Sequence, residues 1–517
     1  MNPGPFVLAI DAGTESIRSG LFDSSGKPIA IASHPYQTFF PYPGWAEQSP
    51  LDWWDGLKKT VAECIQQANI LPEAVKAIAI DATSSTVLPV DSTGKPLSNA
   101  ILWMDGRASK EIELIRQTNH PVLKYSGGED AVEWMVPKML WLKKNHPEIY
   151  QKASKIVECL DWLNFKLTGE WVASICNATC KWNYVSRENG WPDDFFELIG
   201  LEDFREKWPA KVVSLGEVLG VLTSDAANEL GLIASIPVCQ GGIDAHIGML
   251  GMGVVSAGDL SLTIGSSSVH LGLMEEPVWS KGIWGPYPDA VIPGLWLAEG
   301  GQVSTGAITK WFREQLGYPE VQLSTQMGIN AYQILADEAS RVPPGSDGLI
   351  ALDFWQGNRT PYRDPHARGV FVGLTLNHTR AHLYRAILES VAFGTRNILE
   401  TMANAGCVFD KIIVGGGGSK NRLWLQIHAD VCQQPLRTVA FQDSSLLGGA
   451  ICAALGAGWY PSLVEASSSM TRVEGVVEPN PKVYEQYEYS YHKYVEIYHQ
   501  LKEIMTDLSM SSAGGQR

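Results

Sequence analysis

The stretch Phe6–Asp23 reads FVLAIDAGTESIRSGLFD and decides the fold. Its pattern predicts an apolar strand, a tight turn and a second strand. The small turn residues Gly13 and Thr14 let backbone N–H groups approach an anion closely. Asp11 lies near the end of the first strand, where its carboxylate would reach the metal ion of that anion. The hairpin therefore indicates a phosphate site with a magnesium carboxylate and suggests phosphoryl transfer, with an ordinary hairpin and polar turn as the alternative.

The stretch Leu260–His270 repeats this design as LSLTIGSSSVH. Alternating apolar residues give way to Gly265, which is flanked by Thr263, Ser266, Ser267 and Ser268. A serine-rich turn is usually only a turn, so this one gains meaning from its pairing with the first. Two such hairpins, roughly half a chain apart, suggest two similar domains that face each other across a nucleotide.

Length and composition bound the possible classes of protein. At 517 residues the chain exceeds what one core normally holds, so two domains of about 250 residues each are expected. A hydrophobic content of 45% with 19% charged residues indicates a globular protein with large cores. The formal net charge of −16 argues against nucleic-acid and anionic-membrane partners, because it provides no general basic field. ATP is not excluded, since backbone N–H groups and a metal ion can hold its phosphates locally.

The eight cysteines are spread through the chain and form no CxxC pair, so neither a disulfide scaffold nor a zinc cluster is expected. The first residues lack a basic region followed by an apolar core. No stretch approaches the ~20 apolar residues of a membrane span. We therefore expect a cytoplasmic protein with reduced, buried thiols and no membrane partner.

Periodicity along the chain predicts mixed sheets covered by helices. In the first half, strands are expected at 6–10, 17–22, 28–34 and 75–80, helices at 50–69, 107–118, 134–145 and 155–167, and loops or insertions at 35–50 and 191–210. A change from helix to strand near 237–260 indicates the domain boundary. In the second half, strands are expected at 347–352 and 410–414, and helices at 380–406, 420–433 and 446–458. The small, polar tail Ser509–Arg517 is expected to be disordered.

A glycine-rich turn follows the strand predicted at 410–414, in the run KIIVGGGGSKNRLWLQIHADV. Four glycines precede a helix that opens near Ser419 and Asn421, which is the arrangement of a turn where a phosphate or nucleoside approaches a helix N-terminus. Glycine-rich turns between strands and helices are common, so an ordinary connection stays the alternative.

Asp244 lies in the run QGGIDAHIG, just before the predicted boundary. Phosphoryl transfer to an alcohol needs a carboxylate that accepts the proton of the attacking hydroxyl. Aspartates in loops are more often helix caps or turn residues. The position of Asp244 between the two hairpins favours the role of general base.

Together these segments resemble the FGGY carbohydrate kinases, a branch of the actin-like ATPase fold. The resemblance spans about residues 6–460, and its motifs are DAGTESIR, the WxDxR pattern at Trp103–Arg107, GIDAHIG, TIGSSS, GGGGSKN and the run Gly369–Glu389. It implies an α/β fold of two actin-like (ribonuclease H-like) domains, each a mixed sheet flanked by helices, with the active site in the interdomain cleft. The implied domains are 1–258 and 259–490, followed by a helix end and tail at 491–517.

The resemblance also implies a role for individual residues. Asp244 would be the catalytic base, and Asp11 would help to hold Mg²⁺. ATP would be bound by Gly13, Thr14, Thr263, Gly265, Ser266, Gly416, Gly417 and Asn421. Ser266 stands where many members of the family have threonine, and its hydroxyl preserves the chemistry.

Within the family the chain looks most like ribulokinase-type members, and among these like the D-ribulokinase branch. The sugar-binding residues implied by that resemblance are Ser84, Ser85, Asp105, Lys181, Asp244, Ala245 and Glu299. The pair Ser84–Ser85 stands where glycerol-kinase-type members carry Arg-Glu, which disfavours glycerol. Lys181 as a merely solvated residue and Glu299 as a helix cap are the alternatives.

The expected reaction is ATP-dependent phosphorylation of a pentulose, D-ribulose first, with L-ribulose, ribitol and D-xylulose open. The expected partners are a small sugar and ATP, with no nucleic acid, and a homodimer is left open. Two other classes stay in view: an actin-like ATPase or filament protein, and a non-catalytic sugar sensor. ATP turnover that depends strictly on an added polyol would separate a kinase from both.

Overall fold

Tertiary contacts divide the chain into two units, each assembled from separate stretches of sequence. The computed structural model describes residues 4–514, with only the backbone for 512–514. The first unit comprises Met1–Ala257, Leu273–Ala298 and Asp443–Arg472, and the second comprises Gly258–Gly272, Glu299–Gln442 and Val473–Arg517. Contacts therefore assign residues 443–472 to the first unit. The domains predicted from the sequence, which are continuous and meet at residue 258, stay a prediction.

The first unit is built on a sheet of six strands in the order β11-β12-β5-β1-β2-β3. These strands are β1 (Phe6–Ala12), β2 (Ser16–Phe22), β3 (Pro28–Pro35), β5 (Val75–Ala82), β11 (Val218–Val221) and β12 (Pro237–Cys239). The β1–β2–β3 meander is antiparallel, as the hairpin pattern predicts. Strands β1, β5 and β12 run parallel to one another, so their carboxyl ends lie at the same edge of the sheet.

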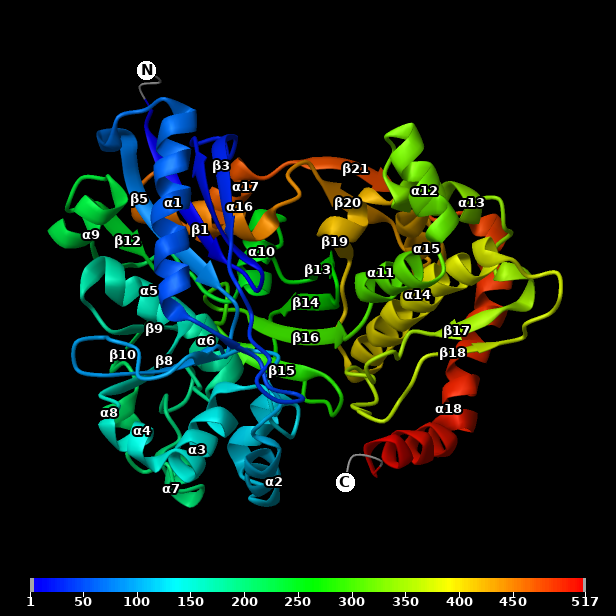
Figure 1. The fold of residues 1–517 in the computed structure, drawn as a ribbon, viewed down its shortest axis with the longest axis horizontal. Helices are drawn as coiled ribbons and strands as arrows, with labels where there is room; N and C mark the ends of the chain where they lie inside the picture. Colours follow the sequence, from blue (N-terminus) through cyan, green and yellow to red (C-terminus); the bar gives the residue numbers. More distant parts are fainter. Residues whose placement is uncertain (1–3, 515–517) are drawn as a thin grey trace. The chain divides into compact units, whose positions relative to one another are not determined.

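Helices cover both faces of this sheet (Figure 1). Helix α1 (Pro50–Ala68) packs on one face, where Ile17 of β2 contacts Gly56 and Ser19 bonds to Thr60. Helix α16 (Ser444–Gly456) packs on the other face, where Leu446 meets Gly20. Side chains alternate between the faces of a strand. The even-numbered residues of β1 therefore join the core under α1, and Asp11 points to the face that α16 covers.

Helix α10 (Asp244–Gly251) crosses α16 at very short range because glycines line both helices. A Cβ atom on Gly448 of α16 would lie 2.0 Å from the backbone oxygen of Ile247, and one on Gly251 of α10 would lie 2.0 Å from that of Ser444. No side chain fits there. This close crossing fixes the later part of α10, from Ile247 to Gly251, against the amino-terminal half of α16. Asp244 lies at the other end of the same helix.

The rest of the first unit consists of small sheets and helices attached to the main sheet. One sheet has the order β4-β7-β6-β8, with β4 (Glu47–Gln48), β6 (Val87–Val90), β7 (Ala100–Ile101) and β8 (Lys155–Glu158). Strands β9 (Val172–Ser174) and β10 (Lys211–Val213) pair with each other, and β15 spans Trp284–Pro288. The helices are α2 (Ser109–Gln117), α3 (Met135–Asn145), α4 (Pro147–Lys152), α5 (Cys159–Thr168), α6 (Ile175–Lys181), α7 (Asp193–Leu198), α8 (Phe204–Lys207), α9 (Ser224–Leu230) and α17 (Leu463–Met470).

Two expectations for this region differ from the structure. The segment predicted as one helix at 155–167 is strand β8 followed by helix α5, because Glu158 caps α5 and ends the strand. The segment 191–210, predicted as a loop or an insertion, is not simply a loop: it contains the short helices α7 and α8, whose buried Phe195, Phe196 and Phe204 join an aromatic cluster. Tertiary packing outweighs local proline content there.

The second unit contains the strand order β16-β14-β13-β19-β20-β21. These strands are β13 (Asp259–Ile264), β14 (Ser268–Met274), β16 (Trp296–Gln302), β19 (Lys411–Gly415), β20 (Leu436–Val439) and β21 (Val473–Val477). Strand β13 is antiparallel to β14 and parallel to β19, so the second hairpin forms as predicted. The remaining elements are β17 (Ile350–Leu352), β18 (Val370–Val372), α11 (Gly306–Gln315), α12 (Tyr318–Met327), α13 (Ala331–Ala339), α14 (Arg380–Ala405), α15 (Arg422–Cys432) and α18 (Tyr484–Gly514).

Helix α18 continues to Gly514 and so includes much of the tail for which the sequence predicts disorder; residues 515–517 lie outside the described residues. Tertiary contacts hold this end of the helix, because Ser509 is buried and bonds to His366 at 3.1 Å and to Arg368. Among residues 4–514, no helix is long and apolar enough to cross a membrane.

The α10–α16 crossing gives the first testable prediction. Gly448→Ala should lower the free energy of unfolding by about 1–3 kcal/mol, because the added methyl group meets a backbone carbonyl that cannot move aside cheaply. Chemical denaturation measures this. Gly417→Ala is the control, since a Cβ atom there has no neighbour within 4 Å. Equal stability of wild type and Gly448→Ala would contradict the close crossing.

Candidate active site

Three aspartates lie at the carboxyl ends of three neighbouring parallel strands in the first unit. Asp11 of β1 is in register with Asp81 of β5. Beyond the end of β12, Ile243 forms a parallel bridge with Ala82 of β5, and Asp244 is the next residue. The sequence Ile-Asp-Ala occurs at all three places, which are 10–12, 80–82 and 243–245. This repeat was the signal that could have identified Asp81, which sequence reasoning missed.

Asp11 is buried and forms an ion pair with Arg18 on the adjacent strand β2. Arg18 also donates to Asp443, the residue before α16, at 2.6 Å. Burial raises the pKa of Asp11 to about 6, even though the Arg18 guanidinium opposes this. About a third of the Arg18 side chain (34%) is exposed, so its guanidinium is available to pair with an anion. The sequence contains Arg18 within DAGTESIR, but no feature of that run assigned it a role.

Asp81 is completely buried, and neither of its carboxylate oxygens has a hydrogen-bond partner. Its Oδ2 atom lies 3.0 Å from the position that a Cβ atom would occupy on Gly449, so α16 needs glycine there. Burial and the neighbouring carboxylates of Asp11 and Asp244 raise the pKa of Asp81 well above its ordinary value. An unpaired buried acid is costly for folding, and such groups are found mainly at functional sites.

Asp244 is the first residue of α10 and is half-buried. Its Oδ1 atom accepts a hydrogen bond from the backbone N–H of Ala245 at 2.7 Å. Burial, together with the Asp11 carboxylate, raises the pKa of Asp244 to about 7. A carboxylate with this pKa can accept a proton near neutral pH. The role of Asp244 as general base stays a prediction.

The first phosphate turn is held by residues from outside the hairpin. Gly13 donates its N–H to the Ser16 carbonyl at 3.1 Å, and its own carbonyl accepts from the Tyr36 hydroxyl. The indole N–H of Trp103 donates to the Thr14 hydroxyl at 3.0 Å. The predicted DAGTESIR and WxDxR motifs therefore meet through Trp103, the first residue of the second motif.

A magnesium ion could be held by Asp11 and Asp81 together with ligands from outside the chain. Asp11 Oδ1 and both Asp81 oxygens are buried without partners, so they can accept a cation. Within residues 4–514, no group of three or more His, Cys, Asp or Glu side chains is arranged to hold a metal ion. Mg²⁺ commonly binds through one or two carboxylates, several waters and substrate phosphates. This donor set fits Mg²⁺ bound with a nucleotide.

Lys181 is buried at the end of α6, with 5% of its surface exposed. Its Nζ atom lies 4.6 Å from the ring centroid of Trp134 and 5.6 Å from those of Trp284 and Tyr287. Aromatic faces stabilise an ammonium group at such distances. Lys181 is therefore not the solvated residue of the alternative interpretation, and its contact with a sugar stays a prediction.

The other predicted sugar residues of the first unit differ in their surroundings. Ser84 is half-buried, whereas Ser85 is buried with a left-handed backbone (φ 55°) and an unpartnered hydroxyl. Asp105 is fully buried and accepts hydrogen bonds from the Ala46 backbone and from Arg107. Arg107 in turn bonds to Glu47. This network fixes the WxDxR loop, and a direct role of Asp105 in sugar binding stays a prediction.

In the second unit, the two predicted nucleotide turns lie side by side. Thr263 of β13 is in register with Gly415 of β19, so the turns at 265–267 and 416–420 follow the carboxyl ends of adjacent parallel strands. The carbonyls of Gly265 and Ser266 accept hydrogen bonds from the first N–H groups of α11. Gly416 has φ 84°, and a Cβ atom there would lie 2.6 Å from the Ile264 oxygen, so only glycine fits.

The remaining predicted residues of the second unit occupy defined positions. Gly417 has open space around it, and the Asn421 side chain caps α15 by accepting from the Trp424 N–H at 3.1 Å. Glu299 is buried within strand β16, and the next helix, α11, begins at Gly306. The alternative interpretation of Glu299 as a helix cap therefore does not match its position.

Sequence models of one enzyme family match both halves of this chain. The model for the N-terminal domain of the FGGY family of carbohydrate kinases matches residues 6–251, and the model for its C-terminal domain matches residues 260–457. The chain belongs to the FGGY family of carbohydrate kinases. It is therefore a sugar kinase, and kinases of this family use ATP.

Relatives and solved structures agree with this family. The chain is 36% identical to an FGGY carbohydrate kinase domain-containing protein of Xenopus laevis, over 96% of this chain and 97% of the relative. It is 34% identical to a ribulokinase of Geobacillus thermodenitrificans, over 95% and 94%. A xylulose kinase structure from Rhodospirillum rubrum matches with a TM-score of 0.84 at 27% identity, covering 97% of this chain and 99% of that one. The predicted family, enzyme class and pair of actin-like domains are confirmed.

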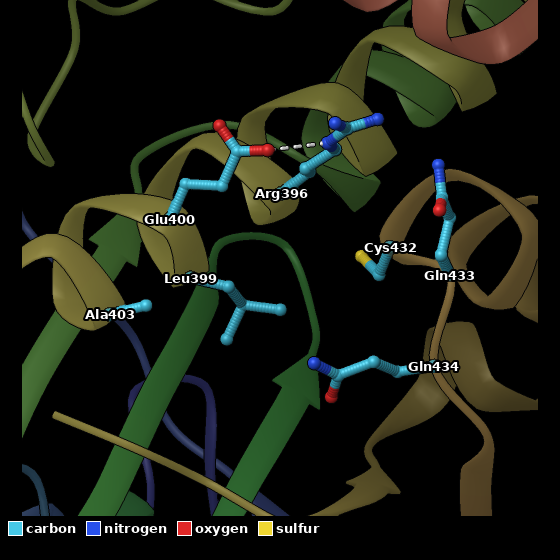
Figure 2. A pocket seen from close by; sticks show the side chains of 7 residues that line it. All are labelled: Arg396, Leu399, Glu400, Ala403, Cys432, Gln433 and Gln434. Atoms are coloured by element: carbon cyan, nitrogen blue, oxygen red, sulfur yellow. Dashed lines mark hydrogen bonds and ion pairs between the residues drawn. The ribbon is translucent and has the colours of Figure 1, made fainter.

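A separate surface pocket lies in the second unit between α14 and the carboxyl end of α15 (Figure 2). It has a volume of about 270 Å³ and is lined by Arg396, Leu399, Glu400, Ala403, Cys432, Gln433 and Gln434. Arg396 and Glu400 bond to each other at 2.7 Å, one helical turn apart. This lining shares no residue with the candidate active site of this FGGY kinase.

The unpaired carboxyl of Asp81 gives the second prediction. Because the folded state raises the pKa of Asp81, the ligand-free protein loses stability as pH rises from about 4 through that raised pKa. Asp81→Asn removes this loss. The variant should match wild type near pH 4 and be more stable by about 1–3 kcal/mol at pH 9. Denaturant unfolding of the ligand-free protein at both pH values measures the difference.

Asp91→Asn is the control with the opposite sign. Asp91 accepts hydrogen bonds from Thr93 and Lys95, which lower its pKa. It therefore contributes stability above its unfolded pKa and loses it as pH falls, so its variant should be less stable than wild type at pH 9. An Asp81→Asn variant that loses stability at high pH in the same way would show that Asp81 is paired.

Proposed function

We propose that this kinase transfers the terminal phosphate of ATP to the terminal hydroxyl of a pentulose, with D-ribulose as the first choice and D-ribulose 5-phosphate as the product. The ribulokinase relative and the xylulose kinase structure support a pentulose. The observation that carries the proposal is Asp244, a carboxylate with a pKa of about 7 next to the strand ends of Asp11 and Asp81. L-Ribulose, ribitol and D-xylulose are the alternative substrates.

In this proposal Asp244 accepts the proton of the attacking hydroxyl. The sugar oxygen then forms its bond to the terminal phosphorus while the bond from that phosphorus to ADP breaks. Phosphoryl transfer depends mainly on positioning and on electrostatic stabilisation of the phosphate oxygens. Thr14 would supply a backbone N–H group, Gly13 would leave the turn without a side chain beside the phosphates, and Arg18 would supply a guanidinium. Mg²⁺ held by Asp11, when bound, would neutralise phosphate charge.

The second unit would hold the nucleotide. Its phosphates would contact Thr263, Gly265 and Ser266, and its adenosine would contact Gly416, Gly417 and Asn421. The open space around Gly417 and the obligatory glycine at Gly416 support close approach of a planar group to this turn. Asn421 would act mainly by fixing the start of α15, since its side-chain oxygen already accepts a helix N–H.

The sugar would be bound by Ser84, Ser85, Asp105, Lys181, Ala245 and Glu299, with Asp244 at the reacting hydroxyl. Lys181 places an ammonium group within an aromatic surrounding, and ammonium N–H groups can donate to sugar hydroxyls. Because such buried polar groups lose their partners when a hydroxyl is missing, they can discriminate strongly between sugars.

A substrate panel tests the proposed function directly. Purified protein is assayed for ADP release with D-ribulose, L-ribulose, D-xylulose, ribitol, erythritol and glycerol, each with ATP and Mg²⁺. The proposal predicts that ADP release requires a five-carbon substrate and is fastest with D-ribulose. ATP hydrolysis that is independent of sugar would instead indicate an actin-like ATPase, and binding without turnover would indicate a sensor.

The role of Asp244 gives the third prediction. Asp244→Asn should lower kcat by about 10²–10⁴ with sugar affinity largely kept, because the amide cannot accept the proton. In wild type, kcat/KM should rise between pH 6 and pH 8, since the protonated acid below its pKa of about 7 is inactive. A folded Asn variant with near-normal turnover, or a flat pH profile in wild type, would refute the assignment.

Lys181 gives the fourth prediction. Lys181→Met should lower kcat/KM for the sugar by a factor that corresponds to a loss of about 2–4 kcal/mol in transition-state binding, because it removes charged donors from a buried site. The KM for ATP should change little. Lys166→Met is the matched control, since Lys166 also lies over a tryptophan ring, at 4.6 Å from Trp54, on a helix without predicted site residues. Equal losses in the two variants would remove Lys181 from the sugar site.

A further inference from the structure

Two charged side chains of the first unit, Lys138 and Glu158, are completely buried beneath the predicted sugar-binding segments. Lys138 lies on α3 and Glu158 ends strand β8. Neither was predicted as a site residue. Removing a charge from water costs several kcal/mol unless hydrogen bonds compensate. The hydrogen-bond partners of Lys138 and Glu158 therefore indicate the role of these two charged groups.

Lys138 donates to two backbone carbonyls that belong to different loops. Its Nζ atom lies 2.9 Å from the oxygen of Ser85 and 2.5 Å from that of Leu102. Ser85 belongs to the predicted sugar loop. Leu102 opens the turn that leads to Asp105, whose N–H in turn donates to the Leu102 carbonyl at 3.0 Å. One ammonium group therefore joins the Ser84–Ser85 loop to the WxDxR loop.

Glu158 accepts hydrogen bonds from the same first loop and from a third segment. Its carboxylate accepts from the backbone N–H of Ser85, from Asn177 at 2.8 Å and from the indole N–H of Trp182. Asn177 lies on α6, and Trp182 is the residue after Lys181. Glu158 therefore holds both ends of the helical segment that carries Lys181.

The backbone of Ser85 is held from both sides by these two groups. Its N–H donates to Glu158 and its carbonyl accepts from Lys138. Its φ of 55° lies in the left-handed region, which a serine adopts at a cost of about 1–3 kcal/mol. Such a conformation persists only when its surroundings impose it. The hydrogen bonds that Ser85 makes with Lys138 and Glu158 hold it in this conformation.

We propose that Lys138 and Glu158 are positioning residues that fix the three sugar-binding segments, around Ser85, Asp105 and Lys181, in one arrangement. This inference rests on the proposed sugar site. Neither residue touches substrate; each acts through the backbone or side chains that it holds. Burial lowers the pKa of Lys138 to about 7, and burial raises that of Glu158. Keeping charges at such a cost is expected where function, rather than stability, requires them.

Binding measurements on two variants test the inference. Lys138→Met keeps the side-chain length without the charge, and Glu158→Gln keeps the volume with altered hydrogen bonding. Isothermal titration with the sugar that wild type phosphorylates should show about tenfold or greater loss of affinity in each, whereas affinity for ATP should stay within about twofold. A folded Lys138→Met or Glu158→Gln variant with wild-type sugar affinity would overturn the proposal.

Lys155→Met is the matched control. Lys155 also donates to two backbone carbonyls of the first unit, those of Glu206 and Trp208, but these segments carry no predicted sugar residue. This variant should therefore keep the sugar affinity of wild type. An equal loss of sugar affinity in Lys155→Met would show that removing any lysine that joins two backbone carbonyls disturbs the unit in general. It would overturn the specific role of Lys138.

Hydrogen exchange provides a readout that does not need a sugar. In ligand-free protein, Lys138→Met should speed exchange at 83–87 and 101–105, and Glu158→Gln should speed it at 83–87 and 177–183, with Lys155→Met unchanged at all three. If wild type turns over no sugar of the panel, the proposed function fails while exchange still decides the positioning role. Unchanged exchange in a folded variant would overturn that role even if the kinase activity is as proposed.

Discussion

The parallel register of β1, β5 and β12 is the constraint on which the candidate active site depends. It brings Asp11, Asp81 and Asp244 to neighbouring strand ends. There, burial raises the pKa of all three, and the Asp11 carboxylate adds to the rise at Asp81 and Asp244. Arg18 relieves part of this repulsion by pairing with Asp11. The rest of the repulsion is not relieved, because several of these carboxyl oxygens accept no hydrogen bond. These buried carboxyl groups are unfavourable without a cation, which supports the proposal that they bind a metal-bound phosphate.

In the proposed function, the two units would bind phosphate by similar means. Each has a hairpin whose turn follows the end of a strand, and each has a parallel neighbour that supplies a second group at the same edge. In the first unit the neighbour supplies a carboxylate, and in the second it supplies the glycine turn after β19. The glycines at Gly416, Gly448 and Gly449 are required by close backbone or side-chain approach rather than by flexibility alone. Small residues therefore set the distances on which both turns depend.

Sequence reasoning predicts the elements whose information is local. The β1–β2–β3 meander, α1, α3, α14 and the second hairpin follow from periodicity and turn chemistry, and the family follows from ordered motifs. What it misses depends on contacts between distant residues. Asp81 is recognised as a site residue only from its register with Asp11. Lys138 and Glu158 look like ordinary helix and strand residues until their hydrogen-bond partners are known. The roles of the individual site residues stay predictions, since sequence similarity establishes the family but not each contact.

The most direct test of the carboxylate arrangement is the number of protons released when Mg²⁺–ADP binds. Isothermal titration near pH 6.5, in buffers with different ionisation enthalpies, measures this number. At pH 6.5 the pKa of about 7 for Asp244 and the raised pKa of Asp81 mean that these carboxyl groups hold protons in the ligand-free protein, whereas Asp11, with a pKa of about 6 and an ion pair to Arg18, is mostly ionised. A cation among them should expel the protons that are held. The account therefore predicts net proton release in wild type and less release in Asp244→Asn. Binding of Mg²⁺–ADP without proton release in wild type would contradict it.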